Sequence, residues 1–200
     1  MTVTELLVTA FNAGMANDVE LHEKWIWVTH KLAADSGVAH MGAVASDSRL
    51  DMLLRVMELE RLERLKAAEA GEVDFADDIF MSLSECWVLR AYEVIRATWE
   101  RHGRPKEGKI YTLVERLGLV RMPIAKGEIQ QAKKAPGPIL LVNIDGSEIK
   151  PYAADGSYVM PRGICGATGA ALWIVANIKS GGSVEICRRD LSNEFLGLFD

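Results

Sequence analysis

The chain has 200 residues, of which 49% are hydrophobic and 26% charged, and its formal net charge is −5 at pH 7. These values are ordinary for a soluble globular protein, and the length allows one large domain or two small ones. No apolar run approaches the ~18–20 residues that a helix needs to cross a bilayer, which excludes a membrane-spanning helix.

Location and cofactors are indicated by what the sequence lacks. The N-terminus has neither the basic region nor the long apolar stretch of a signal peptide. Cys86, Cys165 and Cys187 are scattered without a CxxC pair, so neither a disulfide framework nor a zinc site is indicated. His22 and His30 have no metal-ligating partner at the required spacing. We therefore expect a cytoplasmic protein without a metal or cofactor.

The first part of the chain predicts helices at residues 5–13, 17–34 and 49–70, with the small-residue stretch 35–48 as a loop. In the second helix, Trp27 lies nearly opposite the apolar stripe, so this helix should have contacts on a second side. The third helix has three oppositely charged pairs at helical spacing, namely Asp51–Arg55, Glu58–Arg61 and Glu60–Arg64.

The stretch Ile79–His102 predicts the long helix around which the chain is organised. Asp77 or Asp78 can cap its start, and Gly103 follows its last apolar residue. At about 100° per residue, its apolar side chains form two neighbouring rows that cover about half of the circumference. A helix with so much apolar surface needs neighbours on two sides. We expect it at the centre of the core, or partly in a subunit interface. The two rows are Phe80, Leu83, Trp87, Ala91, Val94 and Thr98, and Met81, Val88, Tyr92, Ile95 and Trp99.

After this helix the sequence predicts two short helices and then strands. The helices are expected at residues 110–117, ending at Gly118, and from Pro123 to about Lys134. From residue 136 the hydrophobic period shifts toward two, and Pro151 confines its strand to an edge or bulge. Asp-Gly turns at 145–146 and 155–156 and the Ser-Gly-Gly turn at 180–182 separate the strands. Strands are predicted at 139–144, 147–152, 158–160, 170–178 and 183–188, and a last helix, capped by Asp190, at 191–199.

This order of elements predicts an α+β protein. An N-terminal helical bundle, residues 1–135, should be followed by a small antiparallel β-meander with a short C-terminal helix, residues 136–200. We expect the two parts to pack together as one unit.

Charge is distributed unevenly along the chain. Residues 1–89 carry 7 Lys/Arg against 16 Asp/Glu, residues 90–134 carry 11 against 5, and residues 135–200 carry 5 against 7. The basic segment 90–134 could attract an anionic partner, nucleic acid included, or could neutralise the acidic half of the same protein.

Two candidate sites for chemistry stand out. Arg162–Gly169, RGICGATG, has three glycines but precedes a strand and lacks a following Lys-Ser/Thr, so it is interpreted as a loop or bulge rather than a phosphate-binding loop. Cys165 within it would need a histidine from the helical half to act as a Cys–His nucleophile.

The second is the pair Arg96 and His102, which fits the R-x(4–6)-H pattern of HEPN proteins, a family of helical bundles that includes many ribonucleases. This resemblance implies a metal-independent ribonuclease with Arg96 and His102 as catalytic residues. On a regular helix, however, six residues leave the two side chains about 120° apart. Arg96 should then share the charged face with Glu93 and Glu100.

The function expected from the sequence is a non-catalytic interaction protein that forms a homo-oligomer through its helical half. No catalytic residue is assigned in this interpretation. The ribonuclease using Arg96 and His102 is the alternative.

Overall fold

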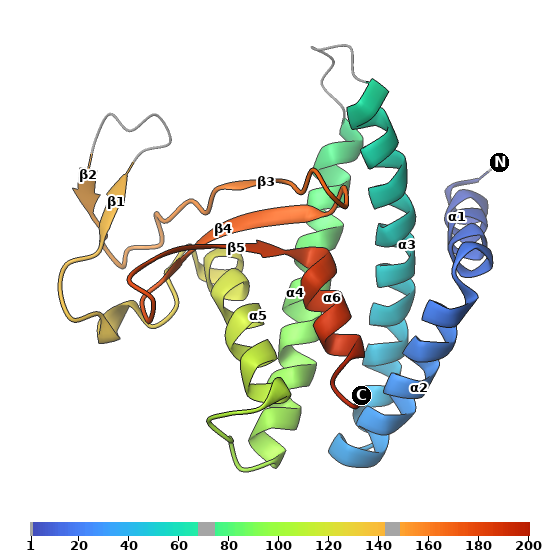
Figure 1. The fold of residues 1–200 in the computed structure, drawn as a ribbon, viewed down its shortest axis with the longest axis horizontal. Coiled ribbons are helices and arrows are strands. Elements are labelled where there is room, and N and C mark those ends of the chain that lie inside the picture. The colour runs from blue at the N-terminus through green and yellow to red at the C-terminus, as the bar shows by residue number, and fades with distance from the viewer. Residues whose placement is uncertain (1, 68–74, 143–148) are drawn as a thin grey trace.

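The computed structural model describes residues 2–67, 75–142 and 149–200, and it confirms the α+β fold class with the helices first. Figure 1 shows an upright bundle of helices, with the strands extending from its upper part to one side. The helices are α1 (Val3–Asn17), α2 (Val19–Ser36), α3 (Ala39–Ala67), α4 (Phe75–Arg101), α5 (Lys109–Lys126), the 3-10 turn η1 (Ala132–Lys134) and α6 (Arg188–Leu196). The strands are β1 (Leu140–Val142), β2 (Ile149–Pro151), β3 (Arg162–Ile164), β4 (Ala171–Asn177) and β5 (Gly182–Cys187).

Helix α4 is the centre of the core, as its two apolar rows predict. It packs against α3 and α5, and also contacts α2 and β4. Its side chains Trp87, Val88, Ala91 and Ile95 are fully buried. The predicted cap at Asp77 or Asp78 is wrong, because the helix begins at Phe75 and both aspartates lie in its first turn. There they still interact favourably with the positive end of the helix dipole.

The first and third helices are longer than predicted, whereas α2 has the predicted length. α1 begins after the capping residue Thr2 and continues through Gly14, which packs against α3 at Met52 and Val56. The predicted loop 35–48 is wrong, since α3 begins at Ala39. Alanine favours helix, and the burial of Val44 and Asp47 against the rest of the bundle offsets the cost of Gly42.

The two short helices predicted after residue 108 are one helix, α5, which continues through Gly118 and Pro123 and ends at Gly127 in the left-handed conformation. Gly118 serves packing rather than termination, because a Cβ there would lie 2.5 Å from Nε2 of Gln130. The second of these helices was predicted to continue to about Lys134, but after Gly127 this stretch contains only the short 3-10 turn η1.

The strands form two antiparallel sheets, β1–β2 and β3–β4–β5. The turn at 180–182 and the long strand β4 are as predicted, and Pro151 lies in the two-stranded sheet. Residues 158–160 are not a strand, while Arg162–Ile164, interpreted as loop, is the edge strand β3. The turn predicted at 145–146 and Gly71 lie outside the described residues.

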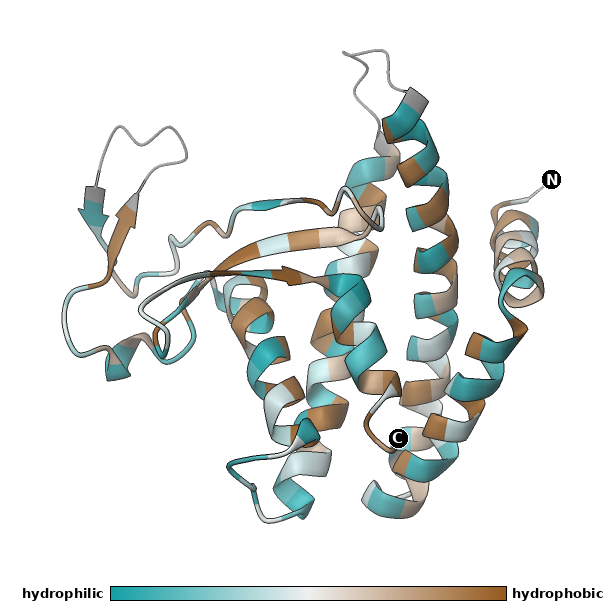
Figure 2. Cartoon of the chain, in the orientation of Figure 1, coloured by the Kyte–Doolittle hydropathy of each residue, from teal (hydrophilic) through white to brown (hydrophobic). Residues whose placement is uncertain are grey.

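One hydrophobic cluster joins the helices to the three-stranded sheet. It contains Trp25 of α2 and Trp87 of α4 together with Trp173 and Val175 of β4. In Figure 2, brown segments recur along α4 and α5 between teal and white ones, whereas the visible part of α1 is mostly pale or brown. Within the described residues, no helix is long and apolar enough to cross a membrane.

Candidate functional site

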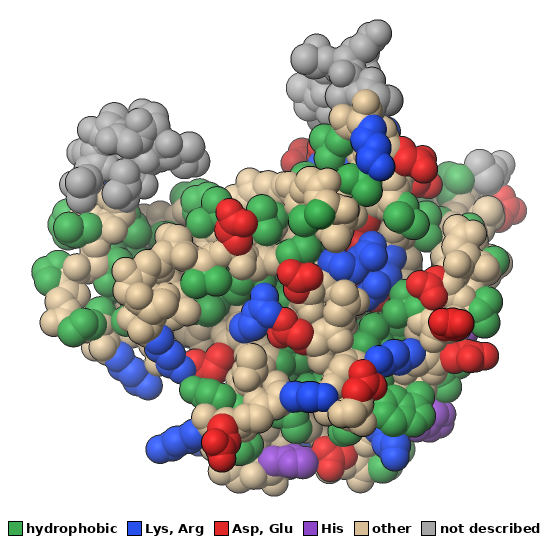
Figure 3. All heavy atoms as spheres, viewed as in Figure 1, with side chains coloured by type: hydrophobic (Ala, Val, Ile, Leu, Met, Phe, Trp, Pro, Cys, Tyr) green, Lys and Arg blue, Asp and Glu red, His purple; other side chains and the backbone are tan. Residues whose placement is uncertain are grey.

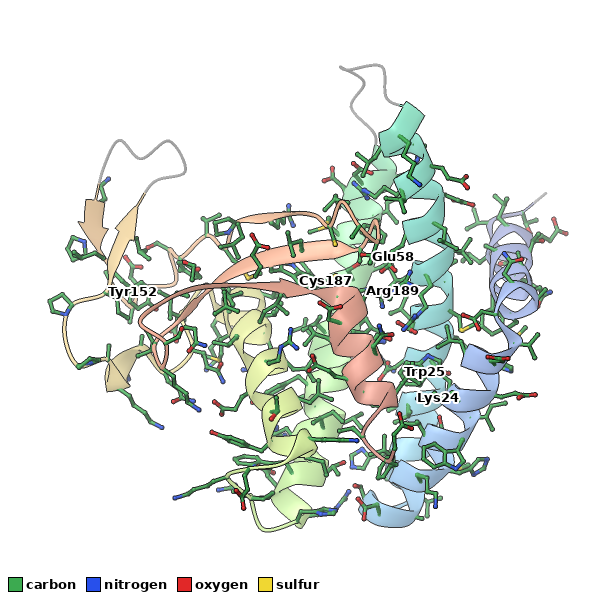
Figure 4. The ribbon with its side chains drawn as sticks, viewed as in Figure 1. Lys24, Trp25, Glu58, Tyr152, Cys187 and Arg189 are labelled. Carbon is green, nitrogen blue, oxygen red and sulfur yellow. The ribbon has the colours of Figure 1, made fainter. Side chains whose placement is uncertain are left out.

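A cluster of buried charges lies where α3 meets the junction of β5 and α6. We call it the arginine cluster; it consists of Asp51, Arg55 and Glu58 of α3 and Arg188 and Arg189 of α6. Figure 4 shows Glu58, Cys187 and Arg189 at this junction, with Trp25 farther down on α2.

Arg188 is the centre of the cluster, and its side chain is fully buried together with those of Asp51 and Glu58. Its Nη1 donates to Oδ1 of Asp51 at 2.5 Å and its Nε to Oε1 of Glu58 at 2.6 Å. The guanidinium also lies 5.6 Å from the ring centroid of Trp87. Buried charges are stable only when they are paired and hydrogen-bonded, and here every charge has a partner of opposite sign.

The two remaining arginines complete the pairing at the edge of the cluster. Arg55 Nε contacts Oδ2 of Asp51 at 2.8 Å, and Nε of Arg189 donates to the second oxygen of Glu58 at 2.6 Å. Trp25 Nε1 also donates to Oδ2 of Asp51, at 2.9 Å. Burial alone would raise the pKa of Asp51, but the charges of Arg188 and Arg55 outweigh it and lower this pKa to about 2.

A second buried carboxylate, Asp47, lies one turn earlier on α3. It pairs with Arg90 of α4, and its backbone carbonyl accepts from Nε1 of Trp87. Burial raises the pKa of Asp47, and the hydrogen bond from Arg90 only partly opposes this rise. Asp47, Asp51, Glu58 and Arg61 therefore form a buried polar row along α3.

This row was missed from the sequence, although its spacings of four, seven and three residues, which place the side chains on one side of a helix, are visible there. Glu58 pairs with Arg188 and Arg189, while Arg61 pairs with Asp77 and lies over the ring of Phe80. The Asp51–Arg55 pair is as predicted. Asp51, Glu58 and Arg188 are fully buried, and every charge of the cluster is paired within the chain, so the cluster joins α3 to α6.

Arg96 and His102 do not come together. Arg96 lies between Glu93 and Glu100 and pairs with both, as expected from the charged face of α4. His102 Nε2 is 2.8 Å from Oδ2 of Asp35, at the end of α2. Each residue of the HEPN-like pattern is thus engaged by a carboxylate of this chain.

The basic segment 90–134 is largely paired within the protein. Arg90 contacts Asp47 of the acidic half, and Arg116 contacts Glu194 of α6. Lys109 donates to the carbonyl oxygens of Gly197 and Asp200 at 2.9 Å. On the face in Figure 3, basic and acidic side chains alternate rather than forming one continuous basic patch.

Several large apolar side chains are exposed along α1, and Leu59 is exposed on α3, the helix against which α1 packs. We call these side chains together the α1 surface; their exposed fractions are Val3 73%, Leu6 47%, Leu7 53%, Val8 52% and Leu59 53%. Only Gly14 of α1 is buried. Residues 2–17 contain one charged side chain, Glu5, and it is used in the capping box with Thr2.

The pKa of Cys165 is lowered, mainly by the side chain of Thr168, and no histidine is among the groups that act on it. Among the described residues, no group of His, Cys, Asp and Glu is arranged to hold a metal ion. Comparison with known protein families, with curated proteins and with solved structures finds no match to this chain.

Proposed function

We propose that the protein is an interaction protein that self-associates through the α1 surface, with a second copy of the chain as the partner. The observation that carries this proposal is that α1 is a surface helix without a charged outer face. Surface helices ordinarily place charged residues opposite their apolar stripe. The cores of protein interfaces, by contrast, are depleted in charge.

The distribution of apolar residues on α1 supports this assignment. On a helical projection, Val3 and Leu7 lie on the same side as Gly14, which contacts α3, while Leu6 and Val8 flank them. The apolar arc is therefore wider than the side that α3 covers. Covering such side chains contributes about 25 cal/mol per Å² of apolar area.

Neighbouring helices can extend this surface to the size that a dimer needs. A stable interface buries about 800 Å² on each partner, which is more than one face of a 15-residue helix provides. On α3, which packs against α1 at Met52 and Val56, Leu59 and Leu65 are each about half exposed. Val19 and Ile26 give α2 an exposed apolar side as well.

Size-exclusion chromatography with light scattering tests the proposal. At micromolar concentration we expect a particle of at least twice the 22.0 kDa of one chain. Leu7→Glu places a charge in the centre of the α1 surface and should give a monomer with an unchanged circular dichroism spectrum. Asn12→Glu, exposed about 140° away on the same helix, is the matched control and should remain associated. A monomeric wild-type protein would refute the proposal.

The proposal includes a cytoplasmic location. It also includes an anionic partner, which would bind to lysines of the basic segment. Lys106, Lys126, Lys133 and Lys134 form no ion pair within the part of the chain that the structure describes.

The ribonuclease alternative predicts that purified protein cleaves RNA in the presence of EDTA. We expect no cleavage, because Arg96 and His102 are paired with carboxylates at separate places. Cleavage abolished by both Arg96→Ala and His102→Ala would favour the alternative.

A further inference from the structure

Strand β5 is an outer strand of the three-stranded sheet. In the order β3–β4–β5 it pairs with β4 on one side, and no described strand pairs with its other side. Besides β4, the element that it contacts most is α6, which follows it directly. In Figure 1, β5 is the lower of the three strands and leads into α6. Because an outer strand presents unpaired backbone N–H and C=O groups, β5 can pair with one more strand.

The hydrogen bonds of the sheet show which backbone groups of β5 face β4. The N–H of Ile174 in β4 donates to the carbonyl of Pro161 at 2.9 Å, on the side of β3. Hydrogen-bonding groups of successive residues point to opposite sides of a strand, so those of the next residue, Val175, point to β5. Val175 is paired with Val184. The N–H and C=O of Val184 are therefore used within the sheet.

The residues on either side of Val184 have the opposite orientation. The N–H and C=O groups of Ser183 and Glu185 point away from β4, and they form no hydrogen bond with another described residue. The side chains of both residues are exposed. Donors and acceptors that alternate along an extended strand are matched by the backbone of another extended strand. The occupant of this edge is therefore an extended segment of polypeptide.

The opposite edge of the same sheet is less suited to such an occupant. β3 has only three residues, it follows Pro161 directly, and its Arg162 pairs with Glu85 of α4. Short strands, prolines and charged side chains directed back at the protein are features that keep a sheet edge from pairing. β5 has six residues and contains neither proline nor lysine. The free edge of β5 is thus the better of the two for strand addition.

The side chains beside this edge indicate the chemistry of the added strand. Glu185 forms no ion pair within the part of the chain that the structure describes. It is paired with Ile174, whose side chain is 38% exposed on the face of the sheet away from the helices. A basic side chain opposite Glu185 would neutralise it. Ser183 is small and lies diagonally from Ile174, so a large apolar side chain opposite Ser183 can reach across to Ile174.

We propose that β5 binds an extended segment of a partner protein as a fourth, antiparallel strand, with a basic residue opposite Glu185 and a large apolar residue opposite Ser183. Backbone hydrogen bonds to these two residues supply affinity, and the two side chains of the segment supply specificity. In an antiparallel strand the basic residue comes two positions before the apolar one. The α1 surface lies beyond α3 from the sheet, so this site is independent of self-association there (Figure 1).

The test uses the full chain and a fluorescein-labelled synthetic peptide, Thr-Thr-Arg-Val-Trp-Thr-Thr, which has arginine and tryptophan at the required spacing. Fluorescence anisotropy should show saturable binding, and two-dimensional amide NMR should show the signals of Ser183 and Glu185 shifting on addition of the unlabelled peptide. Absence of saturable binding up to about 1 mM peptide would overturn the proposal. Binding that leaves both amide signals unchanged would also overturn it.

Two N-methylated peptides form a matched pair that tests the backbone pairing. The backbone nitrogen of the peptide tryptophan faces β5, whereas that of the neighbouring valine faces away from it. Methylation of the tryptophan nitrogen should weaken binding about tenfold, because a hydrogen bond is lost at a close contact, and methylation of the valine nitrogen should have little effect. Equal effects of the two methyl groups would show that the peptide does not bind as a strand of the sheet.

Variants of the protein test the same contacts from the other side. Ser183→Pro removes the outward N–H and leaves the hydrogen bonds to β4 in place, so peptide binding should weaken about tenfold. Glu185→Arg should reverse the charge preference, so that a peptide with glutamate in place of arginine binds more tightly than the original. Glu107→Arg, an exposed carboxylate outside the sheet, is the control and should leave the preference for arginine unchanged.

If Ser183→Pro does not fold, as judged by circular dichroism, the charge reversal at the exposed side chain of Glu185 still decides. An unchanged preference for the arginine peptide in Glu185→Arg would overturn the proposed register. Peptide binding is measured by anisotropy and self-association by light scattering, so this proposal and the association through the α1 surface can each fail alone.

Discussion

At the residue scale, the arginine cluster is the feature with the largest energetic consequences. Three guanidinium groups and two carboxylates lie between α3 and α6, and Arg188, Asp51 and Glu58 are wholly removed from water. A buried ion pair gains little over an apolar pair of the same shape, because desolvation offsets the attraction. Removing one partner is costly, since it leaves an uncompensated charge in the core.

We therefore expect Arg188→Met to destabilise the protein by about 3–5 kcal/mol, as for the loss of one partner of a buried pair. Methionine fills much of the space of the arginine stem but leaves Asp51 and Glu58 each with one arginine fewer. Urea unfolding followed by circular dichroism measures the effect. Arg162→Met is the control, because its pair with Glu85 is half exposed and should be worth about 0–1 kcal/mol. Equal losses in the two variants would contradict this prediction.

The lowered pKa of Asp51 leads us to expect that the protein loses stability at low pH. Its pKa is about 2 in the folded protein and 3.8 for an ordinary aspartate, so folding favours the charged form. The resulting stabilisation, about 2 kcal/mol, is fully present above pH 4 and is lost as the pH falls from about 4 to 2. The raised pKa of Asp47 acts in the opposite direction, because protonation of that group favours the folded state.

The free energy of unfolding, measured in urea at several pH values, gives the slope of stability against pH. This slope tests the prediction. Asp51→Asn removes the titrating group, so the variant should lose less stability than the wild type between pH 4 and 2. The comparison uses slopes rather than absolute values, because the substitution itself lowers stability by disturbing the arginine cluster. A wild-type slope equal to that of the variant would show that Asp51 does not have a lowered pKa.

At the element scale, the sequence predicts best where one pattern dominates. α4 has two continuous apolar rows, and both its existence and its central place follow from them. The start of α3 and the continuity of α5 did not follow, because Gly42, Gly118 and Pro123 locally favour a break. Packing overrides this preference: Gln130 occupies the space that Gly118 leaves.

At the candidate sites, contacts between residues close in the sequence could be predicted, whereas contacts between distant residues could not. The pairing of Arg96 with Glu100 follows from helical spacing alone, since the partners are four residues apart. The contact of Glu58 with Arg188 joins residues 130 positions apart, and that of Thr168 with Cys187 depends on strand register. No local pattern specifies such pairs before the sheet and α6 are placed on α3. The low charge of α1, by contrast, is visible in the sequence, because positions 2–17 contain a single acidic residue and no basic one.

Trp173 gives a prediction about β4. It is fully buried in the core, whereas the next residue, Ile174, points to the other face of the sheet and is 38% exposed. Trp173→Ala should therefore destabilise the protein by roughly 3–5 kcal/mol, as for a buried large aromatic residue. Ile174→Ala should cost less than half as much in the same urea titration. A loss below about 1 kcal/mol for Trp173→Ala would mean that the strand does not pack on the helices as described.

At the scale of the whole molecule, the two predicted parts of the chain share their interior. Strand β4 contributes to the same hydrophobic cluster as α2, α4 and α5. The arginine cluster adds a polar connection, because Arg188 and Arg189 follow β5 directly and pair with α3. Lys24 of α2 and Asp200, whose side chains are 2.8 Å apart, connect the C-terminal residues to the bundle at the surface. The α1 surface lies on the far side of α3 from the sheet, so association there leaves these contacts untouched (Figure 1).

This shared interior predicts that α3 and the β5–α6 segment unfold together. If either segment opened alone, Asp51 and Glu58 would lose Arg188, and buried charges would remain without their main partner. Hydrogen exchange measured by mass spectrometry at increasing urea should give equal opening free energies for peptides covering residues 51–58 and 182–196. Arg188→Met should lower both by the same amount. The β1–β2 pair is the internal control: Leu140 is 60% exposed, so this sheet should exchange at a lower free energy. Protection of α3 that persists after β5 and α6 have exchanged would show instead that the bundle is a separate folding unit.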